Sequence, residues 1–109
     1  MSEMYIGIYP FKNWNNEKNP FQHHGLICKY QSIHYNPSGI HVLEGEKYND
    51  ESPISKRYAG SYPDASVVTD AIEAIENDWR SDNYHALWHN CQNFVDALIN
   101  AINNRLAKI

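Results

Sequence analysis

The order of the elements along the chain, with short strands in the first half and two helices in the second, predicts an α+β domain. Three observations lead to this fold class. Apolar runs with strand-like alternation lie within residues 6–44, a proline-containing turn divides them, and apolar residues recur at helical spacing from residue 66 onward. We therefore expect a small antiparallel β-sheet packed against two or three helices. The 109 residues are expected to form a single domain that spans residues 1–109.

Two strands are predicted before residue 36. Ile6–Tyr9 is a short apolar run, and Pro10 ends it because proline cannot donate to a sheet ladder. His24–Tyr30 is the second strand, and Ser32–Tyr35 continues or restarts it. Alternation places one set of side chains on a single face of the second strand: His24, Leu26, Cys28 and Tyr30.

A hairpin is predicted around Asn36–Gly39. This segment reads Asn-Pro-Ser-Gly, with proline at the second position of the turn and glycine at the fourth, as tight turns favour. Ile40–Glu44 is then the returning strand. If the turn joins the two strands directly, His34 and His41 lie opposite each other across the hairpin.

Two polar segments are predicted to be exposed loops. Residues 12–20 and residues 45–65 are rich in turn-forming residues and contain few apolar ones. Because the chain is short, any groove on its surface must be formed by few loops, chiefly residues 10–22 and 45–65.

Two helices are predicted in the second half of the chain. Ser66 to about Arg80 carries apolar residues on one helical face, with Asp64 or Ser66 as the N-cap. After a short polar break, a final helix runs from about Cys91 to Ala107. Its buried stripe consists of Phe94, Val95, Leu98, Ile99, Ile102 and Leu106.

Charge and hydropathy exclude some classes of partner. The net charge is -4, and no basic cluster exceeds Lys56-Arg57, so the electrostatic footprint of a nucleic-acid-binding protein is missing. The mean hydropathy is -0.65, and no apolar run approaches the length of a membrane span. The segment Met1–Met4 lacks the features of a signal peptide. We expect a cytoplasmic protein, or one delivered or secreted without a classical signal peptide.

Cys91 is the most informative residue of the chain. Asn90 is a favoured helix N-cap residue, so Cys91 is predicted to lie in the first turn of the last helix. Free N–H groups and the positive end of the helix dipole favour an anion there, and a thiolate is the reactive form of cysteine. Two interpretations remain open on this pattern: a nucleophile, or a buried packing residue one turn before Phe94.

The second cysteine, Cys28, lies inside an apolar strand and is expected to be a packing residue. Two cysteines are too few for a disulfide framework, so free thiols in a reducing compartment are expected. A single bridge between Cys28 and Cys91 is the alternative.

Histidines upstream offer a base for Cys91. His24 is in phase with the buried residues of its strand, and His23 is the alternate base. A third group commonly orients such a base, and either His34 or His41 would serve. Surface hairpin histidines without a catalytic role are the alternative interpretation for both residues.

A metal site is the rival interpretation of the histidines near Cys91. His85 and His89 are spaced i, i+4, which on a helix places two imidazoles on one face, as in zinc sites. Asn90 makes a continuous helix through both positions doubtful, and no glutamate follows His85 as in the HExxH pattern. We therefore expect neither a metal nor a cofactor.

The segment Asn90-Cys91-Gln92-Asn93-Phe94-Val95, with an amphipathic helix before and after it, resembles the NC-x-x-F element of circularly permuted papain-like proteins. These include the NlpC-related hydrolases, the lecithin:retinol acyltransferase-like enzymes and the PPPDE desumoylating isopeptidases. Their catalytic histidine precedes the cysteine, at the start of a strand, and His23-His24-Gly25-Leu26-Ile27 is similar to that element. The resemblance covers roughly residues 20–105.

This resemblance implies a permuted papain-like fold in which Cys91 matches the nucleophile and His24 the base. It implies His41, or with less support His34, as the third residue, and His23 as the alternate base. Residues 28–31 stand where the acyltransferase-like members have a glycine-rich turn, so the third residue is not securely matched. The expected substrate-binding residues are Trp14, Tyr84, Asn90 and Gln92.

The leading hypothesis is a cysteine hydrolase that cleaves an amide, peptide or isopeptide bond through a thioester on Cys91. A thiol acyltransferase on the same fold is the alternative within the enzyme class. A non-catalytic binding or inhibitory module is the hypothesis from another class, with a cognate inhibitor or target protein as its partner. Its surface would consist of aromatic residues in the loops: Trp14, Phe21, Tyr48, Tyr58 and Tyr62.

Overall fold

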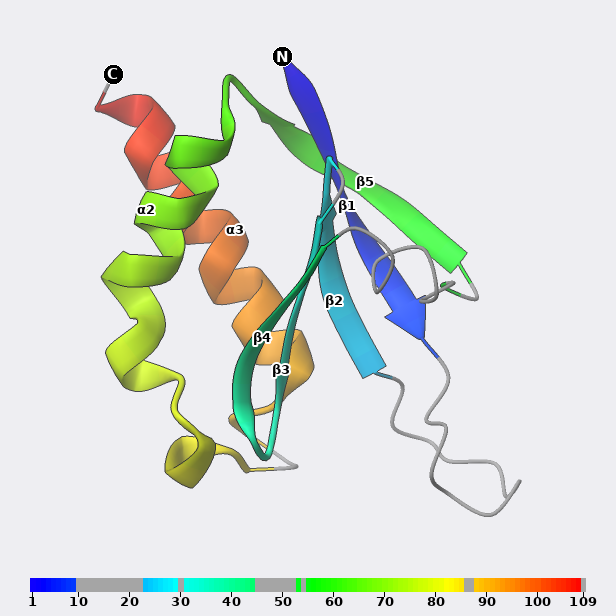
Figure 1. Ribbon diagram of the computed structural model, residues 1–109, viewed down its shortest axis with the longest axis vertical. Coiled ribbons are helices and arrows are strands. Elements are labelled where there is room, and N and C mark those ends of the chain that lie inside the picture. The colour runs from blue at the N-terminus through cyan, green and yellow to red at the C-terminus, as the bar shows by residue number, and fades with distance from the viewer. Residues whose placement is uncertain (10–22, 30, 45–52, 54, 86–87, 109) are drawn as a thin grey trace.

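The computed structural model describes residues 1–9, 23–29, 31–44, 53, 55–85 and 88–108. The predictions for Trp14, Phe21, Tyr48 and most of the two loops lie outside the described residues. The described chain forms an α+β domain with a five-stranded sheet, as predicted, and two α-helices. In Figure 1 both helices lie on the same side of the sheet.

The sheet is antiparallel throughout, with the strand order β4-β3-β2-β1-β5. β3, β2 and β1 are therefore the inner strands of this sheet, and β4 and β5 are its edge strands. The strands are β1 (Ser2–Tyr9), β2 (His23–Cys28), β3 (Gln31–Asn36), β4 (Gly39–Glu44) and β5 (Ser55–Tyr62).

The prediction that residues 45–65 form a loop is wrong for β5. This strand pairs with β1 along its length, with a β-bulge between Met4 and Tyr5. Its first half is exposed, and only its end is deeply buried, where Tyr62 is 3% exposed. An edge strand that is solvent-exposed over its first four residues carries no alternation of apolar and polar side chains, so pattern analysis could not detect it.

The hairpin predicted around Asn36–Gly39 is confirmed. β3 and β4 pair from Asn36 opposite Gly39, which places His34 directly opposite His41. The side chain of Asn36 accepts a hydrogen bond of 2.8 Å from the N–H of Ser38, and Gly39 has a φ of 107° that favours glycine. β1 begins earlier than predicted, at Ser2 instead of Ile6.

The last helix, α3 (Cys91–Ala107), has the bounds that its amphipathic pattern predicts. The preceding helix, α2 (Ala65–Ile75), is capped by Asp64 as predicted, but it ends before Arg80. Two 3₁₀ turns follow it, η1 (Glu76–Asp78) and η2 (Ser81–Asn83). Asparagine and aspartate are poor helix formers, and they fill the positions after Glu76.

The core lies between the helices and the sheet. The side chains of the inner strands that face the helices are almost fully buried, as are the apolar stripes of α2 and α3. Within the described ranges, no helix is both long enough and apolar enough to cross a membrane. The most deeply buried large side chains are Met4, Leu26, Ile33, Tyr35, Val68, Phe94, Val95, Leu98 and Ile102.

Candidate functional site

Cys91 is the first residue of α3, and a reciprocal cap holds it there. The side chain of Asn90 accepts hydrogen bonds from the N–H groups of Gln92 (3.0 Å) and Asn93 (3.2 Å). The side chain of Asn93 accepts in turn from the N–H of Asn90 at 3.1 Å. This capping box satisfies three main-chain donors and determines where the helix begins. Cys91 is thereby directed toward the sheet, where it is 4% exposed.

The start of α3 packs against the start of β2, where the two histidines lie. The main-chain N–H of His24 lies 3.4 Å from the Sγ atom of Cys91. His24 is on the helix-facing side of β2, in phase with the buried residues Leu26 and Cys28. The structure therefore brings the predicted nucleophile into contact with the main chain of the predicted base, although 67 positions separate them in sequence.

The environment of Cys91 keeps its thiol protonated. Burial raises the pKa of Cys91, while the N–H groups of His24, Gln92 and Cys91 itself lower it by a smaller amount. The N–H groups at the first turn of α3 favour the thiolate, but the effect of desolvation on the pKa of Cys91 is larger than theirs. A thiol in this state needs a base to remove its proton at the moment of attack.

His24 is neutral at neutral pH. Its ring is partly buried, and burial lowers its pKa below the ordinary value of 6.5. The positive charge of Arg57 lowers the pKa further, and the negative charge of Asp96 raises it. A neutral imidazole has a free nitrogen lone pair, so His24 is in the protonation state that a proton acceptor requires.

A second histidine arrangement occupies the opposite face of the sheet. The Nε2 atom of His23 and the Nδ1 atom of His34 share a hydrogen bond of 2.8 Å, and the two rings stack. The Nε2 atom of His34 lies 2.9 Å from the hydroxyl oxygen of Ser32. Burial is the main cause that lowers the pKa of both His23 and His34, to about 4.

His34 is thus the residue whose ring contacts His23, whereas the resemblance implies His41 as the third residue. The His41 ring lies near the tip of the hairpin instead, where its Nε2 atom shares a hydrogen bond of 3.2 Å with the side-chain oxygen of Asn36. Gly25 is the feature of the sequence that indicates where the His34 ring lies. A Cβ atom at Gly25 would come within 2.6 Å of the His34 ring, so glycine is needed opposite this imidazole.

Three of the four expected substrate-binding residues are described, and they lie around Cys91. Tyr84 is half-buried, and Cys91 is near enough to raise its pKa beyond the effect of burial. Gln92 is exposed at the first turn of α3. The side chain of Asn90 accepts the capping bonds, so its role in the structure is to position Cys91. Trp14 lies outside the described residues.

The arrangement of His85 and His89 does not match the helical zinc pattern. The two residues form an isolated antiparallel bridge through their main chains, with N–H···O distances of 2.9 and 3.0 Å. The His85 ring stacks on Trp88 at 3.5 Å, and the His89 ring stacks on Trp79 at 3.9 Å. Among the residues that the structure describes, no group of three or more acidic, histidine or cysteine side chains is placed to hold a metal.

Cys28 is buried in the core, where its thiol is hydrogen-bonded to the side chain of Tyr62. Burial raises its pKa to about 12, which leaves it protonated and inert across the physiological range. Neither cysteine forms a disulfide, so the alternative of a bridge between Cys28 and Cys91 is wrong for this structure.

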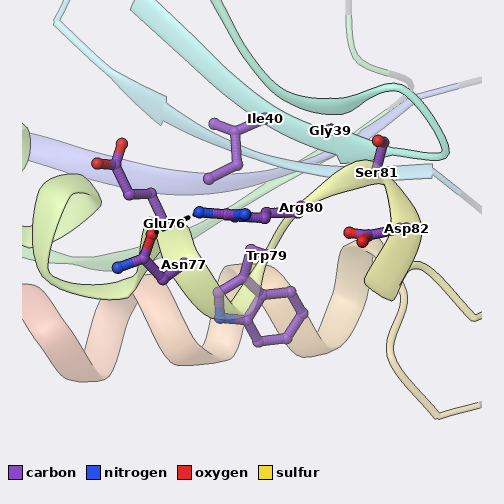
Figure 2. A pocket seen from close by; sticks show the side chains of 8 residues that line it. All are labelled: Gly39, Ile40, Glu76, Asn77, Trp79, Arg80, Ser81 and Asp82. Carbon is purple, nitrogen blue, oxygen red and sulfur yellow. Dashed lines mark hydrogen bonds between the residues drawn. The ribbon is translucent and has the colours of Figure 1, made fainter.

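No protein-family model matches this sequence, and a search of curated proteins finds no relative. The geometry around Cys91 is therefore the basis for assigning a function to this chain. A separate hollow opens between the tip of β4 and the two 3₁₀ turns (Figure 2). There the Arg80 guanidinium lies between Ile40 and Trp79 and donates a hydrogen bond of 3.2 Å to Asn77. None of the residues that line this hollow belongs to the Cys91 site.

Proposed function

We propose that the protein is a cysteine hydrolase of permuted papain-like fold that cleaves an amide, peptide or isopeptide bond. Cys91 is the nucleophile and His24 is the base. The observation that carries this proposal is the 3.4 Å contact between the N–H of His24 and the Sγ atom of Cys91. It seats a cysteine at a helix N-terminus directly against the main chain of the residue that bears the imidazole. A Cys/His dyad further requires a ring nitrogen of that residue within hydrogen-bonding reach of the sulfur, and the variants below test this.

The protonation states of the two residues suit a general-base mechanism. The neutral imidazole of His24 takes the thiol proton as Sγ attacks the carbonyl carbon, and the proton then passes to the leaving amine. This gives a thioester on Cys91, which water hydrolyses with His24 again as the base. The N–H groups of His24 and Cys91, which surround the sulfur, would stabilise the developing oxyanion.

His23 is the alternate base within this proposal. Its ring is held by the hydrogen bond to His34, as a catalytic imidazole is held by a third group. Strand alternation favours His24, because its side chain shares the helix-facing side of β2 with the residues that pack near Cys91.

A binding module without turnover is the second candidate, and one observation favours it. The buried thiol of Cys91 has a raised pKa, whereas a nucleophile that acts as a preformed ion pair has a lowered one. Of the aromatic residues named for its surface, Tyr58 is 58% exposed. Tyr62 is buried in the core, so its assignment to that surface is wrong.

The experiment is acylation by p-nitrophenyl acetate, followed by nitrophenol release and by peptide mapping of the acetylated residue. Wild type, Cys91→Ala, His24→Ala and His23→Ala are compared. Cys28→Ala is the matched thiol control, and His41→Ala is the matched histidine control. We expect a burst located on Cys91 that His24→Ala abolishes and that both controls retain. Acetylation that is no faster than that of free cysteine would reject the enzyme and leave the binding module.

Turnover after the burst separates the two enzyme classes. A hydrolase releases acetate in water alone, so the thioester decays without an added acceptor. An acyltransferase keeps its thioester until an amine such as glycinamide is added. Loss of activity in His23→Ala with full activity in His24→Ala would transfer the role of base to His23.

A further inference from the structure

The helices leave part of the helix-facing side of the sheet uncovered, next to Cys91. β5 is exposed from Ser55 to Tyr58 and becomes buried only toward Tyr62. In Figure 1 the first residues of β5 lie at the end of the sheet away from α2. The uncovered part adjoins the start of β2, because Ser55 pairs with Ile8 and Ile8 pairs with His24.

We name the four side chains on this part of the sheet the shelf: Ile8, His24, Ser55 and Arg57. Directly paired residues of antiparallel strands point to the same face. Arg57 pairs with Ile6, a core residue, so it lies on the helix-facing side. Lys56, one position earlier, points to the opposite face, where its ammonium lies 4.8 Å from the centre of the Tyr5 ring.

Arg57 differs from the other two arginines of the chain. Arg105 forms an ion pair of 2.8 Å with Asp70, and Arg80 donates a hydrogen bond to Asn77. Arg57 is exposed, and within the described part of the chain its guanidinium has no hydrogen bond or ion pair. Its charge nevertheless reaches the imidazole of His24 and disfavours protonation of that ring. Arg57 is thus an available cation within electrostatic reach of His24, in a protein whose net charge is -4.

We propose that Arg57 is a specificity residue that binds a carboxylate of the substrate while Cys91 attacks a neighbouring carbonyl. The substrate class is then an acidic amide or peptide, with a free carboxylate close to the bond that is cleaved. This inference rests on the proposed function. A guanidinium suits the task because its planar donors match both oxygens of a carboxylate. The local positive charge also offsets the repulsion that an anion meets from the rest of the protein.

The charge of Asp96 determines on which side of the shelf a carboxylate binds. This exposed residue of α3 acts on His24 with the opposite sign to Arg57, so the ring is within electrostatic reach of both a cation from β5 and an anion from α3. A carboxylate is attracted toward β5 and repelled from α3. The acidic group of the substrate therefore lies over β5, and groups that bear no negative charge lie toward α3.

Two alkylating reagents that differ in one charge test this inference at Cys91. Iodoacetate and iodoacetamide both form a carbon–sulfur bond with loss of iodide and of the thiol proton, and only iodoacetate carries a carboxylate. We expect Arg57→Gln to lower the ratio of the iodoacetate rate to the iodoacetamide rate at Cys91 about threefold, the size of one exposed charge pair. Asp96→Asn should raise the ratio.

Lys56→Gln is the matched control, because it removes the same charge from the adjacent position on the other face of β5. It should leave the ratio within experimental error. Equal changes in Arg57→Gln and Lys56→Gln would show a general charge effect and overturn the proposal, as would no change in either variant.

A binding measurement separates this proposal from the proposed function. In Cys91→Ser, which cannot acylate as a thiol, the side-chain Nε–H signal of Arg57 is followed by NMR during titration with N-acetyl-aspartate. N-acetyl-asparagine is the uncharged comparison. A saturable shift with the acid alone supports the carboxylate site even if no hydrolase activity exists. No shift, or equal shifts with both ligands, would overturn it even if acylation at Cys91 is observed.

Discussion

Gly25 lies directly opposite His34 in the β2–β3 pairing, and a Cβ atom on Gly25 would approach the His34 imidazole to 2.6 Å. The ring therefore lies over the main chain of the neighbouring strand. From there its Nδ1 atom reaches His23 at 2.8 Å and its Nε2 atom reaches Ser32 at 2.9 Å. The glycine that follows the paired histidines is thus explained by a side chain nine positions later in the sequence.

Replacement of Gly25 by alanine is expected to displace the His34 ring and destabilise the protein by about 1–3 kcal/mol, as overpacking of a filled site does. Urea unfolding measures the loss. His34→Ala removes the atoms that the new methyl group would meet, so the double variant Gly25→Ala/His34→Ala should cost less than the sum of the two single changes. Strict additivity would contradict this explanation of Gly25.

The stability of the protein is expected to fall as the pH falls from about 6.5 to about 4. The folded pKa of both His23 and His34 is lowered to about 4 from an ordinary value of 6.5. In that window the unfolded chain binds protons that the folded rings do not, so acid favours unfolding, and the effect is complete below the folded pKa. The urea midpoint as a function of pH measures it.

Carboxylates also titrate in this window, so a variant is needed to isolate the histidines. The double variant His23→Gln/His34→Gln should show a shallower pH dependence than wild type between pH 6.5 and 4. His41→Gln is the comparison from the hairpin and should keep the wild-type slope. Parallel curves for wild type and the double variant would reject the assignment.

Loss of the cap at Asn90 is expected to cost about 1 kcal/mol of stability. Its side chain accepts hydrogen bonds from the N–H groups of both Gln92 and Asn93, and alanine has no side-chain acceptor to replace it. Asn100→Ala, on the exposed side of the same helix, is the matched control and should be neutral or slightly stabilising because alanine is the better helix former. Because Asn90 also positions Cys91, Asn90→Ala should slow acylation of Cys91 more than the stability loss explains.

Features that depend on neighbouring residues could be predicted from the sequence. The bounds of α3, the cap at Asp64 and the turn at Asn36–Gly39 each follow from side chains within a few positions of one another. The proximity of Cys91 and His24 is a long-range feature, and it was reached through the motif resemblance together with strand alternation. Helix-end chemistry and strand period name both residues as candidates, and the resemblance supplies the choice of Cys91 as a nucleophile over a packing residue.

Features that depend on burial could not be predicted in this way. The pKa of Cys91 is decided by how deeply α3 packs against the sheet, and that depth is not encoded in the first turn of the helix. β5 cannot be detected from its pattern, because its exposed residues Ser55–Tyr58 show no alternation of apolar and polar side chains. The contact of His34 with His23 depends on the register of β2 with β3, which the turn sequence does not determine, so the sequence gives no reason to prefer His34 to His41.

The two thiols are expected to react by different routes, although both have raised pKa values. Burial raises the pKa of Cys28 to about 12, and this residue is 2% exposed in the core. Its alkylation therefore requires unfolding, and its rate should follow the unfolded fraction as urea is added. Cys91 is 4% exposed, but it lies outside the core cluster, at the helix end beside partly buried His24, so iodoacetamide should reach it in the folded protein.

Site-resolved mass spectrometry at pH 8 checks both routes in one experiment. Cys91 should label in native buffer more slowly than a free thiol, because its pKa is raised, and Cys28 should label only in denaturant.

The raised pKa of Cys28 also makes the stability of the protein depend on pH. Between the ordinary pKa of 9.0 and about 12 the unfolded Cys28 loses its proton and the folded one keeps it, so stability falls as the pH rises. Cys28→Ala should reduce this alkaline loss. Labelling of Cys28 in native buffer as fast as Cys91 would mean that the strand carrying Cys28 opens locally, and the core position of this thiol would then not protect it.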